Sequence, residues 1–239
     1  MGHVPRIYRP HGVRPGPLTL EGEQAKHLLT VLRLREGDEF LVFAGDGREW
    51  RATVAGSGRN ALHAVVHELA RQEAAHALSV EVWCGLVRAT RLEWAIEKCV
   101  EAGADLVRPM VSAFASRGEG SAGKQERWER IAIEAAEQCG RLFMAVVTRS
   151  ATLDELLARH HGTLIVADGS GQDWSKVASL VPPRGTVAVV VGPEGGLAPE
   201  EIARLRAAGG LLLRLGPNTL RTETAAVVAT ALLRGAGTQ

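Results

Sequence analysis

The stretch VVGPEGGLAPEE, Val190 to Glu201, runs from an apolar strand through a Gly-Pro-Glu-Gly-Gly turn into a helix start. Pro199 suits the first position of a helix, and the two glutamates after it fall in the first turn, where the helix dipole favours negative charge. Gly195 and Gly196 can adopt positive φ angles and let a ligand lie close to the backbone. The helix start does not explain Glu194. The stretch therefore predicts a strand, a ligand-accessible loop and a helix in succession.

The same alternation of short apolar strands and amphipathic helices extends on both sides of this stretch. Residues 91–104 have the spacing of one buried helix face, and Gly103 is placed to end that helix. Thr152 and Glu155 form a capping-box pair at another helix start. This alternation predicts an α/β fold with a mostly parallel sheet. The helix face is predicted to consist of Leu92, Ala95, Ile96, Cys99 and Val100; the strands are predicted at 78–87, 105–111, 143–147, 162–170, 185–193 and 211–217, with another helix at about 124–139.

The first 70 residues have a different pattern, dominated by strands. Two β-rich runs flank Gly45-Asp46-Gly47, which is typical of a hairpin, and a third run follows at 61–69. One helix is predicted at Glu23–Leu34. Polar and small residues at 70–77 suggest a linker. We therefore predict a small β-barrel-type domain at residues 1–72 and an α/β domain at residues 73–239.

Composition and charge restrict the possible functions. The chain has 239 residues, 46% hydrophobic and 23% charged, which is typical of a soluble globular protein. Its N-terminus lacks the apolar core of a secretion signal and it has no apolar run of membrane-spanning length, so we expect a cytoplasmic protein without a membrane partner. The three cysteines form no metal motif, and we expect no metal. Residues 1–35 hold six basic against two acidic side chains, which favours a local RNA-facing surface.

Three predicted strands end in loops of similar chemistry. These loops are VADGS (166–170), VGPEGG (191–196) and LGPNTLRTETA (215–225). Ligands of open parallel sheets bind at the carboxyl ends of the strands. The loops contain neither the glycine fingerprint of dinucleotide-binding proteins nor the lysine of a triphosphate loop. They instead offer backbone N–H and C=O groups, which suit a neutral or zwitterionic nucleoside-like ligand.

Several motifs together resemble one known family. GPEGGLAPEE followed by LGPNTLRTETA is similar to the C-terminal signature of the bacterial small-subunit ribosomal RNA uridine-N3 methyltransferases, which belong to the SPOUT class. RWERIAIEAAEQCGR (127–141) and PRIYRP (5–10) are similar to other parts of the same family, so the resemblance covers nearly the whole chain. It implies an N-terminal PUA-like RNA-binding barrel and a C-terminal α/β domain with a deep trefoil knot. It also implies a homodimer whose active site lies at the interface, acting on 16S rRNA, expected in the assembled 30S subunit.

The resemblance also implies the cofactor, S-adenosylmethionine (SAM), and its binding residues. The expected cofactor residues are those of the three loops: Ala167, Asp168, Val191, Gly192, Pro193, Glu194, Gly195, Gly196, Leu215, Gly216, Asn218, Leu220 and Thr222. Methyl transfer to uracil N3 removes a proton and develops negative charge on the base oxygens. Arg221 is the candidate that stabilises this charge. Glu223 is expected either to hold Arg221 in place or to act as the base, and a first-turn acid on a helix dipole is the simpler alternative.

A further set of residues is assigned to RNA contacts or to the subunit interface. Arg88 and Arg91 occupy the place of a lysine-glycine element in the family, and Glu137 and Arg141 have the spacing of a helical ion pair. The full set is Arg6, Arg9, His27, Arg33, Arg88, Arg91, Glu137, Gln138 and Arg141. Asn218 stands where the family has arginine. Two alternatives stay open: a knot-fold methyltransferase acting on another RNA, and a non-catalytic ribosome-binding homologue.

Overall fold

The computed structural model describes residues 4–115 and 122–236. The chain divides into two compact units. The first unit comprises Met1–Ala75 together with Glu137–Met144, and the second comprises His76–Ala136 and Ala145–Gln239. The division into functional domains at residues 72 and 73 stays a prediction. The short segment Glu137–Met144 groups with the first unit, although in the sequence it lies between the two stretches that form the second unit.

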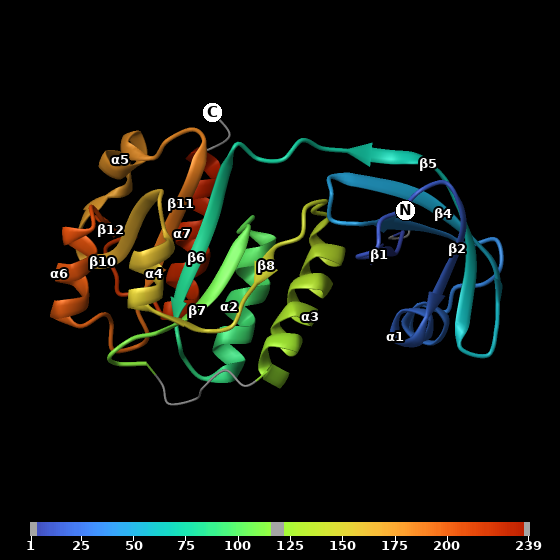
Figure 1. Cartoon of the computed structure of the whole chain (residues 1–239), viewed down its shortest axis with the longest axis horizontal. Coiled ribbons are helices and arrows are strands. Elements are labelled where there is room, and N and C mark those ends of the chain that lie inside the picture. The colour runs from blue at the N-terminus through green and yellow to red at the C-terminus, as the bar shows by residue number, and fades with distance from the viewer. Residues whose placement is uncertain (1–3, 116–121, 237–239) are drawn as a thin grey trace. The chain divides into compact units, whose positions relative to one another are not determined.

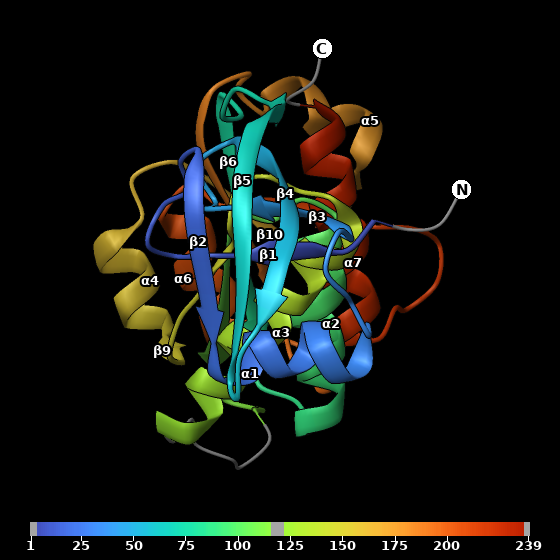
Figure 2. The same ribbon diagram turned by 90° about the vertical axis from the view of Figure 1, so that its right-hand side faces the viewer.

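The first unit is built on a five-stranded sheet. Its elements are β1 (Arg6–Tyr8), β2 (Gly16–Glu21), α1 (Gly22–Lys26), a π-helix η1 (His27–Val31), β3 (Glu39–Phe43), β4 (Arg48–Ser57) and β5 (Ala61–Gln72). The strand order is β1-β3-β4-β5-β2, so β5 lies between β4 and β2 (Figure 2). All neighbours are antiparallel except β1 and β3. Register shifts along β4 and β5 bend the sheet, which forms a PUA-like half-barrel whose path of described strands is open at β1 and β2.

Two sequence predictions in this unit have different outcomes. The hairpin around Gly45-Asp46-Gly47 is confirmed, because Phe43 at the end of β3 pairs with Glu49 in β4. The single helix predicted at Glu23–Leu34 is wrong in type and length. The chain forms one α-helical stretch and then the π-helix, and Arg33 adopts a left-handed φ of 58° that ends the helical segment. β5 also continues to Gln72, into the predicted linker.

The second unit is a seven-stranded parallel sheet with helices on both faces (Figure 1). Its elements are β6 (Leu78–Gly85), α2 (Ala89–Glu101), β7 (Leu106–Val111), α3 (Ala122–Cys139), β8 (Val146–Val147), β9 (Ala151–Thr152), α4 (Leu153–Arg159), β10 (Thr163–Asp173), α5 (Trp174–Val177), the 3₁₀ helix η2 (Ala178–Leu180), β11 (Gly185–Val191), α6 (Pro199–Ala207), β12 (Leu211–Arg214) and α7 (Thr222–Ala236). The order is β12-β10-β11-β6-β7-β8, with β9 also paired to β7. Ligands of such sheets bind at the carboxyl ends of the strands.

The core of this unit lies in two layers because successive strand residues point to opposite faces. On β11, Val187, Val189 and Val191 belong to the layer that contains α2, α3, α5 and α7. Ala188 and Val190 belong to the opposite layer, which contains α4 and α6. All five side chains are buried, which explains why the sequence of this strand is continuously apolar and does not alternate.

Most sequence predictions for this unit are confirmed. The predicted face of α2 is buried along its whole length, and Gly103 ends the helix with a φ of 99°. Thr152 and Glu155 form the expected capping box. The strand predicted at 143–147 is wrong in extent: only Val146 and Val147 pair in the sheet, since Phe143 instead bridges to Asp46 within the first unit. The parallel α/β fold class is thus confirmed, and the trefoil knot stays a prediction.

Candidate cofactor site

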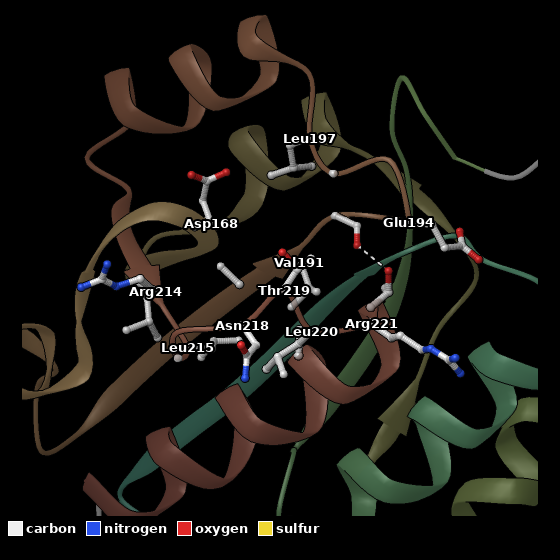
Figure 3. A pocket seen from close by; sticks show the side chains of 18 of the residues that line it. Asp168, Val191, Glu194, Leu197, Arg214, Leu215, Asn218, Thr219, Leu220 and Arg221 are labelled. Atoms are coloured by element: carbon white, nitrogen blue, oxygen red, sulfur yellow. Dashed lines mark hydrogen bonds between the residues drawn. The ribbon is translucent and has the colours of Figure 1, made fainter.

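A cavity of about 590 Å³ lies at the carboxyl ends of β11 and β12 and beside the middle of β10, whose pairing with β12 shifts register between Ala167 and Gln172 (Figure 3). Its walls come from the three segments that the sequence singled out, together with the start of α7. The segment 166–170, predicted as a loop after a strand, lies within β10, which continues to Asp173. The volume falls in the range of small-molecule sites. The lining residues are Ala167, Asp168, Gly169, Val191, Gly192, Pro193, Glu194, Gly196, Leu197, Leu213, Arg214, Leu215, Gly216, Pro217, Asn218, Thr219, Leu220, Arg221, Thr222 and Ala225.

The loop after β11 makes a tight turn that requires glycine at two positions, Gly192 and Gly196. The N–H of Gly196 donates to the carbonyl of Pro193 at 2.8 Å, and Gly196 has a φ of 76° that other residues rarely adopt. A Cβ atom on Gly192 would lie 2.7 Å from the carbonyl carbon of Gly196, so the turn has no room for one. This loop therefore presents backbone to the cavity, as the opening stretch of sequence predicted.

A hydrogen bond ties this loop to the start of α7. The Thr222 hydroxyl donates to the carbonyl of Gly192 at 3.0 Å, and Thr222 is only 3% exposed (Figure 3). The bond joins the loop after β11 to the loop after β12, which are 30 residues apart in the sequence. Two of the three cavity walls are therefore held together by one buried side chain.

The cavity offers space and unpaired backbone donors. Cβ atoms built on Gly169 or Gly216 would meet nothing within 4 Å. Within the described residues, no N–H of Gly216 or of residues 218–220 donates to another backbone group. Such donors suit the hydrogen-bond acceptors of a heterocyclic base. Asp168 and Glu194 supply negative charge at the cavity, and aliphatic side chains supply apolar walls: Val191, Leu197, Leu213, Leu215 and Leu220.

Of the cofactor residues predicted from the sequence, all but one line this cavity. The exception is Gly195, where an added Cβ would lie 3.0 Å from the side chain of Phe114, outside the lining set. The cavity also includes residues that the sequence argument omitted. Some, such as Gly169 and Thr219, lie within the quoted loops and follow from treating each loop as a whole; Leu197, Leu213 and Arg214 lie just outside the loops. The set of omitted residues is Gly169, Leu197, Leu213, Arg214, Pro217, Thr219 and Ala225.

Charged side chains gather beside the cavity at the start of α7. Glu223 is 8% exposed, and its Oε1 lies 3.9 Å from Nε of Arg91. Arg91 Nη1 also donates to Glu194 Oε1 at 3.1 Å. Arg221 lines the cavity but is exposed, and its guanidinium extends away from the aliphatic walls (Figure 3). The arginine next to Glu223 is therefore Arg91, whereas the sequence argument had paired Glu223 with Arg221.

The Cys84 thiol, near Glu223 and Glu194, stays in its neutral form. Cys84, at the end of β6, is fully buried. Burial raises the pKa of the Cys84 thiol, and the neighbouring Cys99 thiol and the carboxylates of Glu223 and Glu194 raise it further. A protonated, buried thiol is a poor nucleophile. The Cys84 thiol is therefore unsuited to act as a nucleophile at this site.

Comparison with known proteins agrees with the site. Residues 74–234 match the family model of the RNA methyltransferase domain, and residues 20–66 match that of the RNA methyltransferase PUA domain. The ribosomal RNA small subunit methyltransferase E of Bacillus subtilis is 32% identical over 91% of this chain and 92% of its own length. That of Mycobacterium bovis is 33% identical over 88% of this chain and 83% of its own length. The chain belongs to the ribosomal RNA small subunit methyltransferase E family.

Solved structures of related proteins contain the cofactor. A putative methyltransferase from Legionella pneumophila, in complex with bound SAM, has a TM-score of 0.89 and 29% identity over 98% of each chain. A ribosomal RNA small subunit methyltransferase E from Neisseria gonorrhoeae, bound to SAM, has a TM-score of 0.85 and 26% identity over 98% of each chain. The cavity in this member of the family fits such a ligand. It combines open space at its glycines, free N–H groups for an adenine edge and two carboxylates for positive charge.

The residues assigned to RNA contacts separate into buried and exposed groups. The Arg6 side chain is only 8% exposed and donates to Glu49 Oε1 at 2.6 Å. It also donates to the carbonyls of Glu137 and Arg141, at 2.9 and 3.2 Å. Arg6 is therefore engaged inside the first unit, which favours a structural role over the expected phosphate contact.

The end of α3 has a similar structural use. Glu137 Oε1 accepts the backbone N–H of Tyr8 at 2.8 Å, and Arg141 Nε donates to the carbonyl of Phe143. The Glu137 side chain thus ties the segment 137–144 to β1, whereas the Arg141 bond lies within that segment. Gln138, by contrast, is exposed.

The remaining candidates for RNA contact lie at the surface or near it. His27, Arg33 and Arg88 are exposed, and Arg9 is half-buried. These four positions keep the RNA-contact hypothesis, which stays a prediction. Within the described residues, no group of three His, Cys, Asp or Glu side chains could hold a metal ion, and no helix is long and apolar enough to span a membrane.

Proposed function

We propose that this protein transfers a methyl group from SAM to N3 of a uridine in 16S ribosomal RNA. The observation that carries the proposal is the cavity at the carboxyl ends of β11 and β12 and beside the middle of β10, formed in part by the loops that carry the family signature. Relatives named for small-subunit ribosomal RNA methylation, which match most of this chain, support the choice of substrate. We further propose that the enzyme works as a homodimer in the cytoplasm and acts on the assembled 30S subunit.

In this reaction the residues of the chain must orient the reactants, exclude water and allow the N3–H proton to leave. When bound, SAM supplies an electrophilic methyl group on a sulfonium. The three loops orient the reactants and exclude water, which is most of the catalytic contribution in an in-line displacement. The N3–H proton must leave, the N3–methyl bond forms as the sulfur–methyl bond breaks, and the sulfur keeps the electron pair. The products are N3-methyluridine, a neutral thioether and one proton.

We assign the charged steps to two residues of the segment that begins α7. Arg221 is exposed at the cavity edge, where its guanidinium can reach an RNA base and neutralise negative charge on O2 or O4. Glu223 has a buried Oε2 without a hydrogen-bond partner among the described residues, so this oxygen is available to accept a proton or a hydrogen bond. Removal of Arg221 should therefore lower the turnover number more than it weakens SAM binding.

The test is methylation of 30S particles that lack the modification. Purified protein and methyl-labelled SAM are incubated with these particles or with free 16S rRNA, and the modified base is mapped by mass spectrometry. We expect one N3-methyluridine, formed by the wild type and strongly reduced in Arg221→Ala. SAM binding with no label on any uridine of either substrate would sink the substrate assignment. Failure to bind SAM would instead favour the non-catalytic alternative. Light scattering should give twice the mass of one chain.

A further inference from the structure

Arg91 occupies a position that helix physics does not favour for a cation. It is in the first turn of α2, and no acidic residue is present in that turn. Unpaired N–H groups give the start of a helix a positive potential, so carboxylates are favoured there and arginine is not. A residue that opposes its local preference points to a requirement outside its own helix.

The side chain of Arg91 reaches two segments that build the cavity. Its Nη1 donates to Glu194 Oε1 at 3.1 Å, in the loop after β11. Its Nε lies 3.9 Å from Glu223 Oε1, in the first turn of α7. One guanidinium on α2 thus spans the cofactor loop and the candidate catalytic carboxylate, and Arg91 itself is not part of the cavity lining.

The two carboxylates are in different environments. The Glu194 side chain is 40% exposed and that of Glu223 is 10% exposed. A buried carboxylate depends on a nearby opposite charge, because water no longer stabilises it. Among the described ion pairs, the cation within 4.0 Å of Glu223 is Arg91. Arg91 lies on the Oε1 side of this carboxylate, and the other oxygen, Oε2, is buried without a hydrogen-bond partner among the described residues.

We infer that Arg91 is a positioning residue that couples cofactor binding to methyl transfer, through Glu194 on one side and Glu223 on the other. The inference rests on the proposed function and extends it to a residue outside the cavity. Through Glu194, Arg91 holds the loop that contacts the cofactor. Through Glu223, it fixes the direction of the carboxylate that serves the reaction. Loss of Arg91 therefore affects two separately measurable quantities.

The experiment measures the Kd of SAM by calorimetry and the turnover number on 30S particles for each variant. Arg91→Ala should weaken SAM binding by about 2- to 5-fold, the scale of one exposed ion pair, and lower turnover by about 10-fold or more. Glu194→Gln should reproduce the loss of affinity, and Glu223→Gln the loss of turnover. Combining Arg91→Ala with Glu194→Gln should weaken binding no further than Glu194→Gln alone, because Arg91 acts on the cofactor loop through Glu194.

Arg91→Lys distinguishes positioning from simple charge. Lysine is a point charge without the planar fork of arginine, so it can pair with Glu194 but cannot face both carboxylates in the same way. We expect it to restore most of the SAM affinity and little of the turnover. Arg127→Gln is the matched control. Arg127, on α3, donates to both carboxylate oxygens of Glu93 at 2.5 and 2.7 Å, and Glu93 is on the same helix α2 as Arg91. The Arg127 side chain is 56% exposed. Both measurements should stay within about twofold of wild type for this control.

The outcomes separate the inference from the proposed function. A wild-type protein that binds SAM but methylates no uridine contradicts the proposed substrate, and the Kd series of the variants then tests the link through Glu194 by itself. A wild-type protein that binds no SAM overturns both the proposed function and the inference. If wild type is active and Arg91→Ala matches it in both Kd and turnover, the inference is overturned. It is also overturned if Arg91→Ala lowers the melting temperature while Arg91→Lys recovers binding and turnover together, since that pattern indicates a purely structural charge.

Discussion

The buried hydroxyl of Thr222 provides the sharpest test of how the cavity is held together. Replacing Thr222 by valine keeps the shape of the side chain and removes the donor to the Gly192 carbonyl. Leaving a buried acceptor unpaired costs about 1–3 kcal/mol. Because this bond joins two cavity walls, we expect the cost to reduce SAM affinity: at about 1.4 kcal/mol per tenfold, the Kd rises by about 5- to 140-fold.

Calorimetry and thermal unfolding together decide this case. Where the lost bond destabilises the whole unit, the melting temperature falls by about 2–4 °C per kcal/mol. Thr222→Ser keeps the hydroxyl and loses the methyl group; it should bind SAM close to wild type, which would show that the hydroxyl is the group that matters. The reasoning is refuted if Thr222→Val binds SAM within twofold of Thr222→Ser, because the loops would then hold their position without the bond.

Three further changes test other parts of the structure. Gly85→Ala should weaken SAM binding, measured by calorimetry, because its Cβ would lie 2.4 Å from the backbone nitrogen of Pro193 and displace the cofactor loop. Gly235→Ala, whose added Cβ would meet no other atom within 4 Å, should bind normally. Arg234→Ala should lower the free energy of unfolding in urea by about 2–4 kcal/mol, because Arg234 bonds to Gly103, Leu78 and Asp105, whereas the exposed Arg204→Ala should change it by less than about 1 kcal/mol. Burial raises the pKa of Cys99 from 9.0 to about 12, so the unfolded chain loses this proton first; stability should be unaffected by this thiol below pH 9 and fall by about 1.4 kcal/mol per pH unit from there toward 12, less steeply in Cys99→Ala. An equal slope in both proteins would contradict that burial effect.

The periodicity of apolar residues was sufficient to predict a helix where one face of that helix is buried. The buried face of α2 has a spacing that only a helix of 3.6 residues per turn produces, and its burial follows directly. The segment His27–Val31 shows the limit of this reasoning. A π-helix differs from an α-helix in hydrogen bonding, and an apolar spacing over so few residues is compatible with both. The extent of that helix was therefore overestimated.

Long-range backbone pairing was the second limit. The sequence placed residues 143–147 in one strand because they are apolar. Phe143 instead bridges to Asp46, and a Cβ on Gly47 would lie 2.5 Å from the Phe143 ring. A short apolar run indicates burial but not the partner against which it is buried. Only the fold reveals that this segment belongs to the first unit.

Charge counting has the same weakness, and it changes the RNA hypothesis. The excess of basic residues in the first 35 positions predicted a phosphate-facing surface, and Arg6 contributed to that count. Arg6 lies beside the buried Glu49, which is 4% exposed and far away in sequence, so its charge is compensated inside the fold. A formal charge acts on a nucleic acid only where solvent reaches it. The hypothesis therefore now depends on the exposed His27, Arg33 and Arg88 and the half-buried Arg9, and on Arg33 most directly. Its left-handed backbone, with a φ of 58°, is unfavourable for a residue other than glycine, and such local strain is concentrated at functional positions.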